Sequence, residues 1–177
     1  MQYSSISDIY EANTSVRTKL KQALASVNEQ QAKVRPDGEN WSIAEVAEHV
    51  SIVGNGMYRI CAKLLSKAEA AGQSSDGAID LTTFGARIGE IAEIKLEAPE
   101  LVRPTGTKSI EESLASLDET ENSFRALLPI FEKFTTDPAK FPHPYLGDMT
   151  AVEWLAMYGL HEGRHLRQIK NILKKMG

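Results

Sequence analysis

The chain has 177 residues, of which 42% are hydrophobic and 25% are charged, and its formal net charge is −4. This composition is that of an ordinary globular protein, and the length predicts a single domain over residues 1–177. The negative net charge argues against a nucleic-acid partner, and no apolar run is long enough to cross a bilayer. We therefore expect neither nucleic-acid binding nor a membrane-spanning segment.

Two features bear on where the protein is found. Cys61 is the one cysteine of the chain, so it cannot form an internal disulfide, which is typical of proteins in a reducing compartment. Residues Met1 to Tyr10 lack the basic stretch and apolar core of an export signal. Both features predict a cytoplasmic protein.

The first predicted helix carries an apolar stripe from Ile6 to Val27, which includes Val16, and fades near Gln30. Ser4 and Ser5 are candidate caps at its start. Asn13 interrupts the stripe. The next predicted element, after a turn at residues 33–40, is a second long helix.

The second helix has a capping box at its start, formed by Ser42 and Glu45, and it ends near Ala71 and Gly72. Its apolar stripe runs from Ile43 to Leu64, and His49 lies at one border of that stripe. The following residues, 73–107, are less periodic. We expect one short helix there, from Phe84 to about Ile94, and an irregular segment over residues 98–107. So long a connection predicts an overhand crossover or a lid over a site.

The third helix begins at a capping box formed by Ser109 and Glu112 and carries a regular apolar stripe. Glu121 interrupts this stripe, as Asn13 interrupts the first. Two explanations fit both residues: each lies at the wet edge of its helix, or both face a polar cavity inside the bundle.

Residues 137–147 hold three prolines and predict a loop, in which His143 is expected to be exposed to solvent. No segment predicts paired strands. Thr150 and Glu153 form the capping box of a final helix. The four long amphipathic helices predict an all-α four-helix bundle, with a long crossover between helices 2 and 3.

The final helix carries the clearest chemical signal. His161 and His165 are four residues apart and so project from one face, which they share with Trp154 and Tyr158. Imidazoles on an apolar stripe need polar partners, and this spacing suits a divalent metal ion. His49 on another helix is a candidate third ligand. The alternative is that each histidine is simply a hydrogen-bonded residue of the core or its border.

The pentapeptide His161–His165 also fits H-E-x-x-H, the signature of zinc peptidases, with Glu162 as general base. Such enzymes need a third ligand downstream, and no His, Asp or Glu follows His165. The sequence therefore disfavours a peptidase. Glu162 nevertheless lies toward the apolar side of the helix, where it could orient a metal-bound water.

Two motifs resemble those of the DinB/YfiT-like superfamily. The first is the run Trp41–His49, and the second is the run His161–Ile169, which ends in the pattern His-x3-His-x2-Gln-Ile. The resemblance covers nearly the whole chain in helix order and spacing. It implies an up-down-down-up four-helix bundle, often dimeric, that binds a divalent metal through His49, His161 and His165.

The resemblance also implies a range of activities. Members of the superfamily include metal-dependent transferases that join a low-molecular-weight thiol to an electrophile, as well as hydrolases. We expect first such a thiol transferase acting on a small-molecule substrate, with zinc or nickel as the metal and the chain as a homodimer. The alternatives are a hydrolase that uses a metal-bound water, with Glu162 or Glu121 as base, and a non-catalytic bundle that binds a metal or a partner in a stress response. Asn13, Glu121 and Tyr158 are candidates to line the pocket.

Overall fold

Each of the four long helices begins at a capping box. In a computed structural model, which describes residues 3–72, 76–91, 94 and 96–176, the caps are Ser5, Ser42, Ser109 and Thr150. Each cap side chain accepts a hydrogen bond from the backbone three residues on, and an acidic side chain there bonds back to the cap. The elements are α1 (Ile6–Ala25), α2 (Glu29–Lys33), α3 (Ile43–Ala71), α4 (Thr82–Ile91), η1 (Glu100–Val102), α5 (Ile110–Lys133), β1 (Lys140–His143), β2 (Gly147–Thr150) and α6 (Ala151–Lys175).

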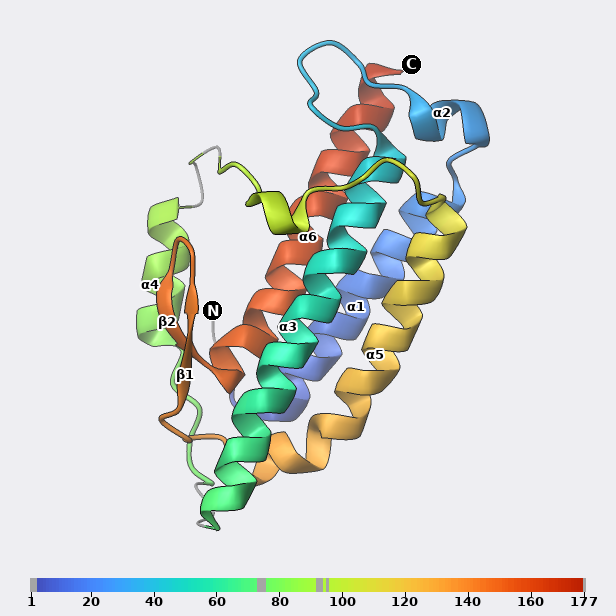
Figure 1. The fold of residues 1–177 in the computed structure, drawn as a ribbon. Coiled ribbons are helices and arrows are strands. Elements are labelled where there is room, and N and C mark those ends of the chain that lie inside the picture. Colours follow the sequence, from blue (N-terminus) through green and yellow to red (C-terminus); the bar gives the residue numbers. More distant parts are fainter. Residues whose placement is uncertain (1–2, 73–75, 92–93, 95, 177) are drawn as a thin grey trace.

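The long helices α1, α3, α5 and α6 form a four-helix bundle, as the sequence predicts (Figure 1). Helices α1 and α6 run in one direction, while α3 and α5 run in the other, which gives the up-down-down-up course. Helix α3 packs against α5 and α6, and α1 packs against α6 and α5. No helix among the described residues has the length and apolar character that a membrane span requires.

Because α3 and α5 are parallel, the chain must return along the whole bundle between them (Figure 1). The expected short helix in this crossover is α4, whose Phe84 is buried. Helix α4 is described as far as Ile91, so the part of the expected helix at residues 92 and 93 lies outside the described residues. The second half of the crossover, residues 96–107, contains η1 and is called the strap below.

The expectation of no paired strands is wrong. Strands β1 and β2 form an antiparallel hairpin just before α6, with Lys140 opposite Thr150 and His143 opposite Gly147. Pro142 is compatible with it because a two-stranded hairpin has free edges, where the missing N–H of proline breaks no ladder bond. Gly147 closes the turn with a φ of +69°, a conformation that suits glycine. The prolines that predicted a loop therefore mark the edge of a small sheet.

The core contains two apolar clusters with a polar layer between them. One cluster includes Phe84, Phe131 and Trp154, and the other includes Leu20 and Ile169. The polar layer holds buried side chains from all four long helices: Asn13, Arg17, His49, Thr120, Glu162 and His165. The first apolar stripe was expected to turn Val16 inward, but the helix buries Arg17 and leaves Val16 only half-buried.

Helices α1 and α6 approach most closely where Asn13 meets Gly159. Asn13 donates from Nδ2 to the carbonyl oxygen of Leu155 at 3.0 Å. A Cβ atom added at Gly159 would overlap the Asn13 Oδ1 and lie 2.8 Å from its Cγ. One turn further along α6, a Cβ at Gly163 would make only an ordinary contact, 3.8 Å from Val16. The two glycines therefore differ sharply in the space beside them.

This difference predicts opposite effects of the same substitution. Gly159→Ala should lower the free energy of unfolding by about 1–3 kcal/mol, because the added methyl forces Asn13 and α1 to shift. Gly163→Ala, the matched control, should raise it by up to about 1 kcal/mol, because alanine favours helix over glycine. Urea unfolding followed by circular dichroism measures both. Equal effects at the two positions would contradict the close packing of α1 on α6.

Candidate metal centre

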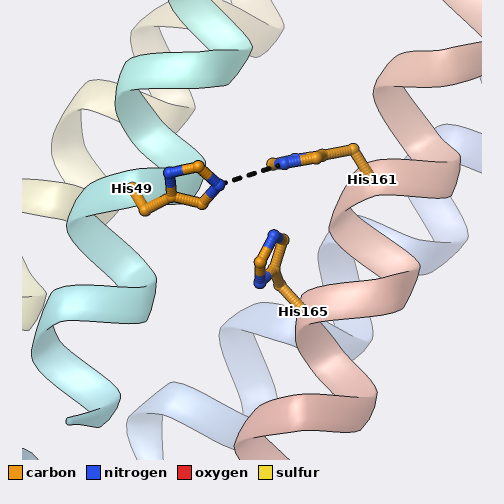
Figure 2. A group of neighbouring side chains, drawn as sticks. All are labelled: His49, His161 and His165. Atoms are coloured by element: carbon orange, nitrogen blue, oxygen red, sulfur yellow. Dashed lines mark hydrogen bonds between the residues drawn. The ribbon is translucent and has the colours of Figure 1, made fainter. Parts of the chain in front are cut away.

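Three histidine side chains from two helices converge in the bundle (Figure 2). His49 comes from α3, and His161 and His165 come from successive turns of α6. One potential ligand nitrogen from each ring lies within 4.8 Å of the others. The expected triad is thus brought together, although His49 and His161 are 112 residues apart in the chain.

The two α6 histidines reach the same place because of their helical spacing, and the antiparallel packing of α3 on α6 supplies the third. The ring centroids are 4.5 Å apart for His161 and His165 and 4.8 Å apart for His49 and His165. The Nε2 atoms of His49 and His161 are 3.3 Å apart. Two nitrogens at about 2.0–2.1 Å from a tetrahedral ion would be separated by roughly 3.4 Å. The observed separation therefore fits two ligands of one ion.

Hydrogen bonds fix which nitrogen of two rings is free. His49 donates from Nδ1 to the carbonyl oxygen of Val102 at 2.7 Å. The Nδ1 of His165 lies 2.8 Å from Oε1 of Gln168, to which it donates. In a neutral imidazole the other nitrogen then has no proton and offers a lone pair. Such outer partners are usual for metal-binding histidines, because they set the tautomer and the direction of the ring.

The electrostatics of the site keep the rings neutral. Burial lowers the pKa of His161 well below 6.5, and the neighbouring His165 and His49 lower it further. Burial and the nearby His49 lower the pKa of His165 to about 3. Burial also lowers the pKa of His49, although its bond to Val102 acts in the opposite direction. At pH 7 the three rings are therefore unprotonated, the form in which imidazole binds a metal.

The strap holds His49 in place. Its Val102 accepts the His49 hydrogen bond, and the buried Glu48 fastens the strap beside it. The Glu48 carboxylate accepts hydrogen bonds from Thr105 N at 3.1 Å, Thr105 Oγ1 at 2.6 Å and Gly106 N at 2.8 Å. Burial would raise the pKa of Glu48, but these bonds outweigh it and lower the pKa, so the carboxylate is ionised.

The carboxylate of Glu162 is already occupied by an ion pair. It pairs with the guanidinium of Arg17 on α1, with Arg17 Nε donating to Glu162 Oε2 at 3.0 Å and Arg17 Nη2 to Oε1. Arg17 also donates to the carbonyl oxygen of Leu117 at 2.7 Å and to the Tyr158 hydroxyl. Both side chains of the ion pair are almost fully buried. The expected role of Glu162 as a base stays a prediction. In the structure its carboxylate pairs with Arg17, and this ion pair competes with any contact to a metal-bound water.

The three other pocket candidates lie together, but apart from the histidines. Asn13, Glu121 and Tyr158 line one small crevice between α1, α5 and α6, and none of the three histidines lines it. Asn13 is buried at this crevice, which fits the cavity explanation, while the partial exposure of Glu121 fits the wet edge of its helix. Glu121 is partly exposed there and pairs with Arg125 at 2.7 Å. That these residues line a substrate pocket at the metal stays a prediction.

Sequence reasoning missed the groups that support the site. Val102 acts through its backbone carbonyl, which no side-chain pattern reveals, and Glu48 bonds residues 57 and 58 positions further on. Gln168 does carry a signal, because it follows His165 by three residues on the same helix face. His143 was expected to be exposed, but it is half-buried against Trp154, at a ring-centroid distance of 5.3 Å.

The chain belongs to the DinB superfamily, whose family model matches residues 12–169. The chain is similar to YuaE of Bacillus subtilis (strain 168), described as an uncharacterized protein, with 21% identity over 154 residues that cover 86% of this chain and 90% of YuaE.

Two solved structures share the fold. TT2238, described as a four-helix bundle protein, matches with a TM-score of 0.64 and 20% identity over 93% of this chain and 98% of its own. YfiT from Bacillus subtilis, described as a probable metal-dependent hydrolase with an unusual four-helix bundle topology, matches with a TM-score of 0.63 and 19% identity over 100% of this chain and 92% of its own. At these identities the likeness extends to the fold.

The hydrogen bonds between Glu48 and the strap predict that losing them weakens metal binding less than losing a ligand does. Glu48→Gln places an amide where a carboxylate accepts two backbone N–H groups, so the strap and the Val102 carbonyl should loosen around His49. We expect zinc affinity, measured by competition with a chromophoric chelator, to fall roughly 10- to 100-fold. His49→Ala should abolish tight binding, and both variants should keep their helical circular dichroism.

Glu69→Gln is the matched control, because Glu69 lies on the same helix but is exposed. It should bind zinc as the wild type does. Wild-type affinity in Glu48→Gln would show that the strap does not position His49.

Proposed function

We propose that the protein is a divalent-metal-dependent hydrolase of a small-molecule substrate. The observation that carries the proposal is the convergence of three neutral imidazoles, two of which have their Nδ1 protons committed to Val102 and Gln168. Three protein ligands leave a coordination position for a water molecule or a substrate, as in catalytic rather than structural zinc sites. The description of YfiT as a probable metal-dependent hydrolase supports the same activity.

The chain's own residues would divide the work as follows. His49, His161 and His165 would hold the ion, and Glu48 would keep the strap against His49. When bound, a divalent ion supplies a positive charge that lowers the pKa of a water molecule and polarises a substrate oxygen. The neutral ligands leave that charge undiminished. The Arg17–Glu162 pair would keep α1 and α6 in register behind the histidines.

Hydrolysis replaces the thiol transferase that we expected first. The transferase rested on the family resemblance, and no described contact adds to it. The chain itself does not supply a reactive thiol: Cys61 is fully buried, and burial raises its pKa, so its thiol is not a nucleophile. A low-molecular-weight thiol as cofactor and a homodimer both stay predictions.

An assay on chelator-treated protein tests the proposal. Adding zinc, nickel, cobalt or manganese should restore hydrolysis of a 4-nitrophenyl ester, and His161→Ala should stay inactive with every metal. The rate should not depend on an added thiol, because water is the nucleophile.

A parallel assay should measure the loss of thiol in the presence of 1-chloro-2,4-dinitrobenzene. Metal-dependent thiol conjugation without ester hydrolysis would contradict the hydrolase proposal and favour the thiol transferase instead. Hydrolysis that survives in His161→Ala would show that the metal centre is not the site of the reaction.

A further inference from the structure

The fourth histidine, His143, lies on the hairpin that leads into α6, the helix of His161 and His165. It is the last residue of β1, and its ring packs on Trp154 of α6. Trp154 precedes His161 by seven residues, about two helical turns, so both project from the same face of α6. Among the groups that lower the pKa of His161, His143 has the smallest effect, which shows that the two rings are near enough to interact when charged.

The hairpin turn and the strap meet next to this face. The Tyr145 hydroxyl donates to the carbonyl oxygen of Glu97 at 2.5 Å, so the turn that carries His143 contacts the strap that holds His49. Figure 1 shows the hairpin beside α4 and the start of α6. The hairpin that carries His143 is therefore tied to α6, the helix of His161 and His165, and to the strap that holds His49.

Backbone hydrogen bonds fix the tautomer of His143. Its Nδ1 accepts the N–H groups of Tyr145 and Leu146, each at 3.2 Å. Burial lowers the pKa of His143, and the charge of Arg87 lowers it further, so the ring is neutral at pH 7. The proton must then be on Nε2. Among the described residues, Nε2 has no hydrogen-bond acceptor.

Contacts with α4 and α6 hold the hairpin and so fix the direction of the Nε2–H group of His143. Arg87 of α4 donates from Nη1 to the carbonyl oxygens of Leu146 at 2.5 Å and Asp148 at 3.2 Å, and from Nη2 to Glu153. On the other side, Trp154 donates from Nε1 to the carbonyl oxygen of Phe141 at 3.3 Å. The ring of His143 is thus fixed by its turn, by Trp154 and by α4.

We propose that Nε2–H of His143 donates a hydrogen bond to an oxygen atom of the substrate at the metal centre. The substrate class that this serves is one with a carbonyl or phosphoryl oxygen that gains negative charge during hydrolysis. A fixed neutral imidazole suits this task, because its donor needs no reorganisation as charge develops. His143 keeps its proton and forms no covalent bond. The proposal rests on the hydrolase function above.

Two substitutions separate this role from a purely structural one. In His143→Asn the amide oxygen can still accept the N–H groups of Tyr145 and Leu146, as asparagine does in an Asx turn, but no donor remains at the Nε2 position. His143→Gln places an amide N–H near the Nε2 position. Comparing the two variants therefore separates the loss of the Nε2–H donor from the loss of the hydrogen bonds in the turn.

The experiment uses the full chain loaded with cobalt(II) and titrated with acetohydroxamate, a small chelating oxyanion, while the visible spectrum of the cobalt is followed. All three proteins should bind cobalt equally and melt at similar temperatures. Acetohydroxamate should bind His143→Asn about tenfold or more weakly than the wild type, because a charge-assisted hydrogen bond is lost. His143→Gln should recover most of the affinity.

Equal acetohydroxamate affinity in wild type and His143→Asn, at full cobalt occupancy, would overturn the proposal while leaving the hydrolase intact. Loss of cobalt from His143→Asn would also overturn it, because His143 would then support the metal site itself. A wild type that binds no cobalt would instead refute the metal centre on which both proposals rest.

Discussion

The packing of α3 against α6 brings three imidazole rings together inside a helical bundle, and this contact governs the chemistry of the molecule. Burial keeps the rings neutral, and the Nδ1 protons of His49 and His165 are bound to oxygen acceptors. The Nε2 of His49 therefore offers a lone pair, which can accept a hydrogen bond from Nε2 of His161, 3.3 Å away, or bind a cation. Such an arrangement is unfavourable unless a proton or a cation lies between the nitrogens. A divalent ion satisfies all three at once.

The surrounding structure can be understood as support for this contact. The overhand crossover, which an up-down-down-up bundle requires, brings the strap to His49, where Glu48 fastens it. On the other side of α6, the buried Arg17–Glu162 pair links α1 to the helix that carries two of the ligands. Removing one partner of such a pair costs about 3–5 kcal/mol, because the other charge is left unpaired. The polar layer therefore gives the bundle a fixed register as well as a site.

The sequence predicts the elements better than the contacts between them. Capping boxes and apolar stripes are local signals, so the four long helices and their starts are found correctly. The pairing of His161 with His165 is also local, because helical spacing alone places both on one face. His49 is different: its place in the triad depends on how α3 packs, so the residues alone made it a candidate, and the family resemblance strengthened the prediction.

The errors have physical reasons as well. Proline and glycine residues predicted a loop where β1 and β2 pair, because a hairpin with free edges tolerates proline. Arg17 is buried inside the bundle because Glu162, 145 residues away, neutralises it, and no local pattern reveals such a partner. For the same reason, the sequence did not reveal that Arg17 occupies the carboxylate of Glu162, the candidate base. Long-range polar partners are what the sequence could not show.

The most direct test of the metal centre is X-ray absorption at the zinc edge on wild-type protein loaded with one equivalent of zinc. The account predicts three imidazole nitrogens at about 2.0–2.1 Å, with the remaining coordination from a light atom such as oxygen. Outer-shell scattering from three rings should fall to two in His49→Ala if zinc is retained at all. Zinc bound by fewer than three imidazoles in the wild type, or no zinc bound, would contradict the central claim.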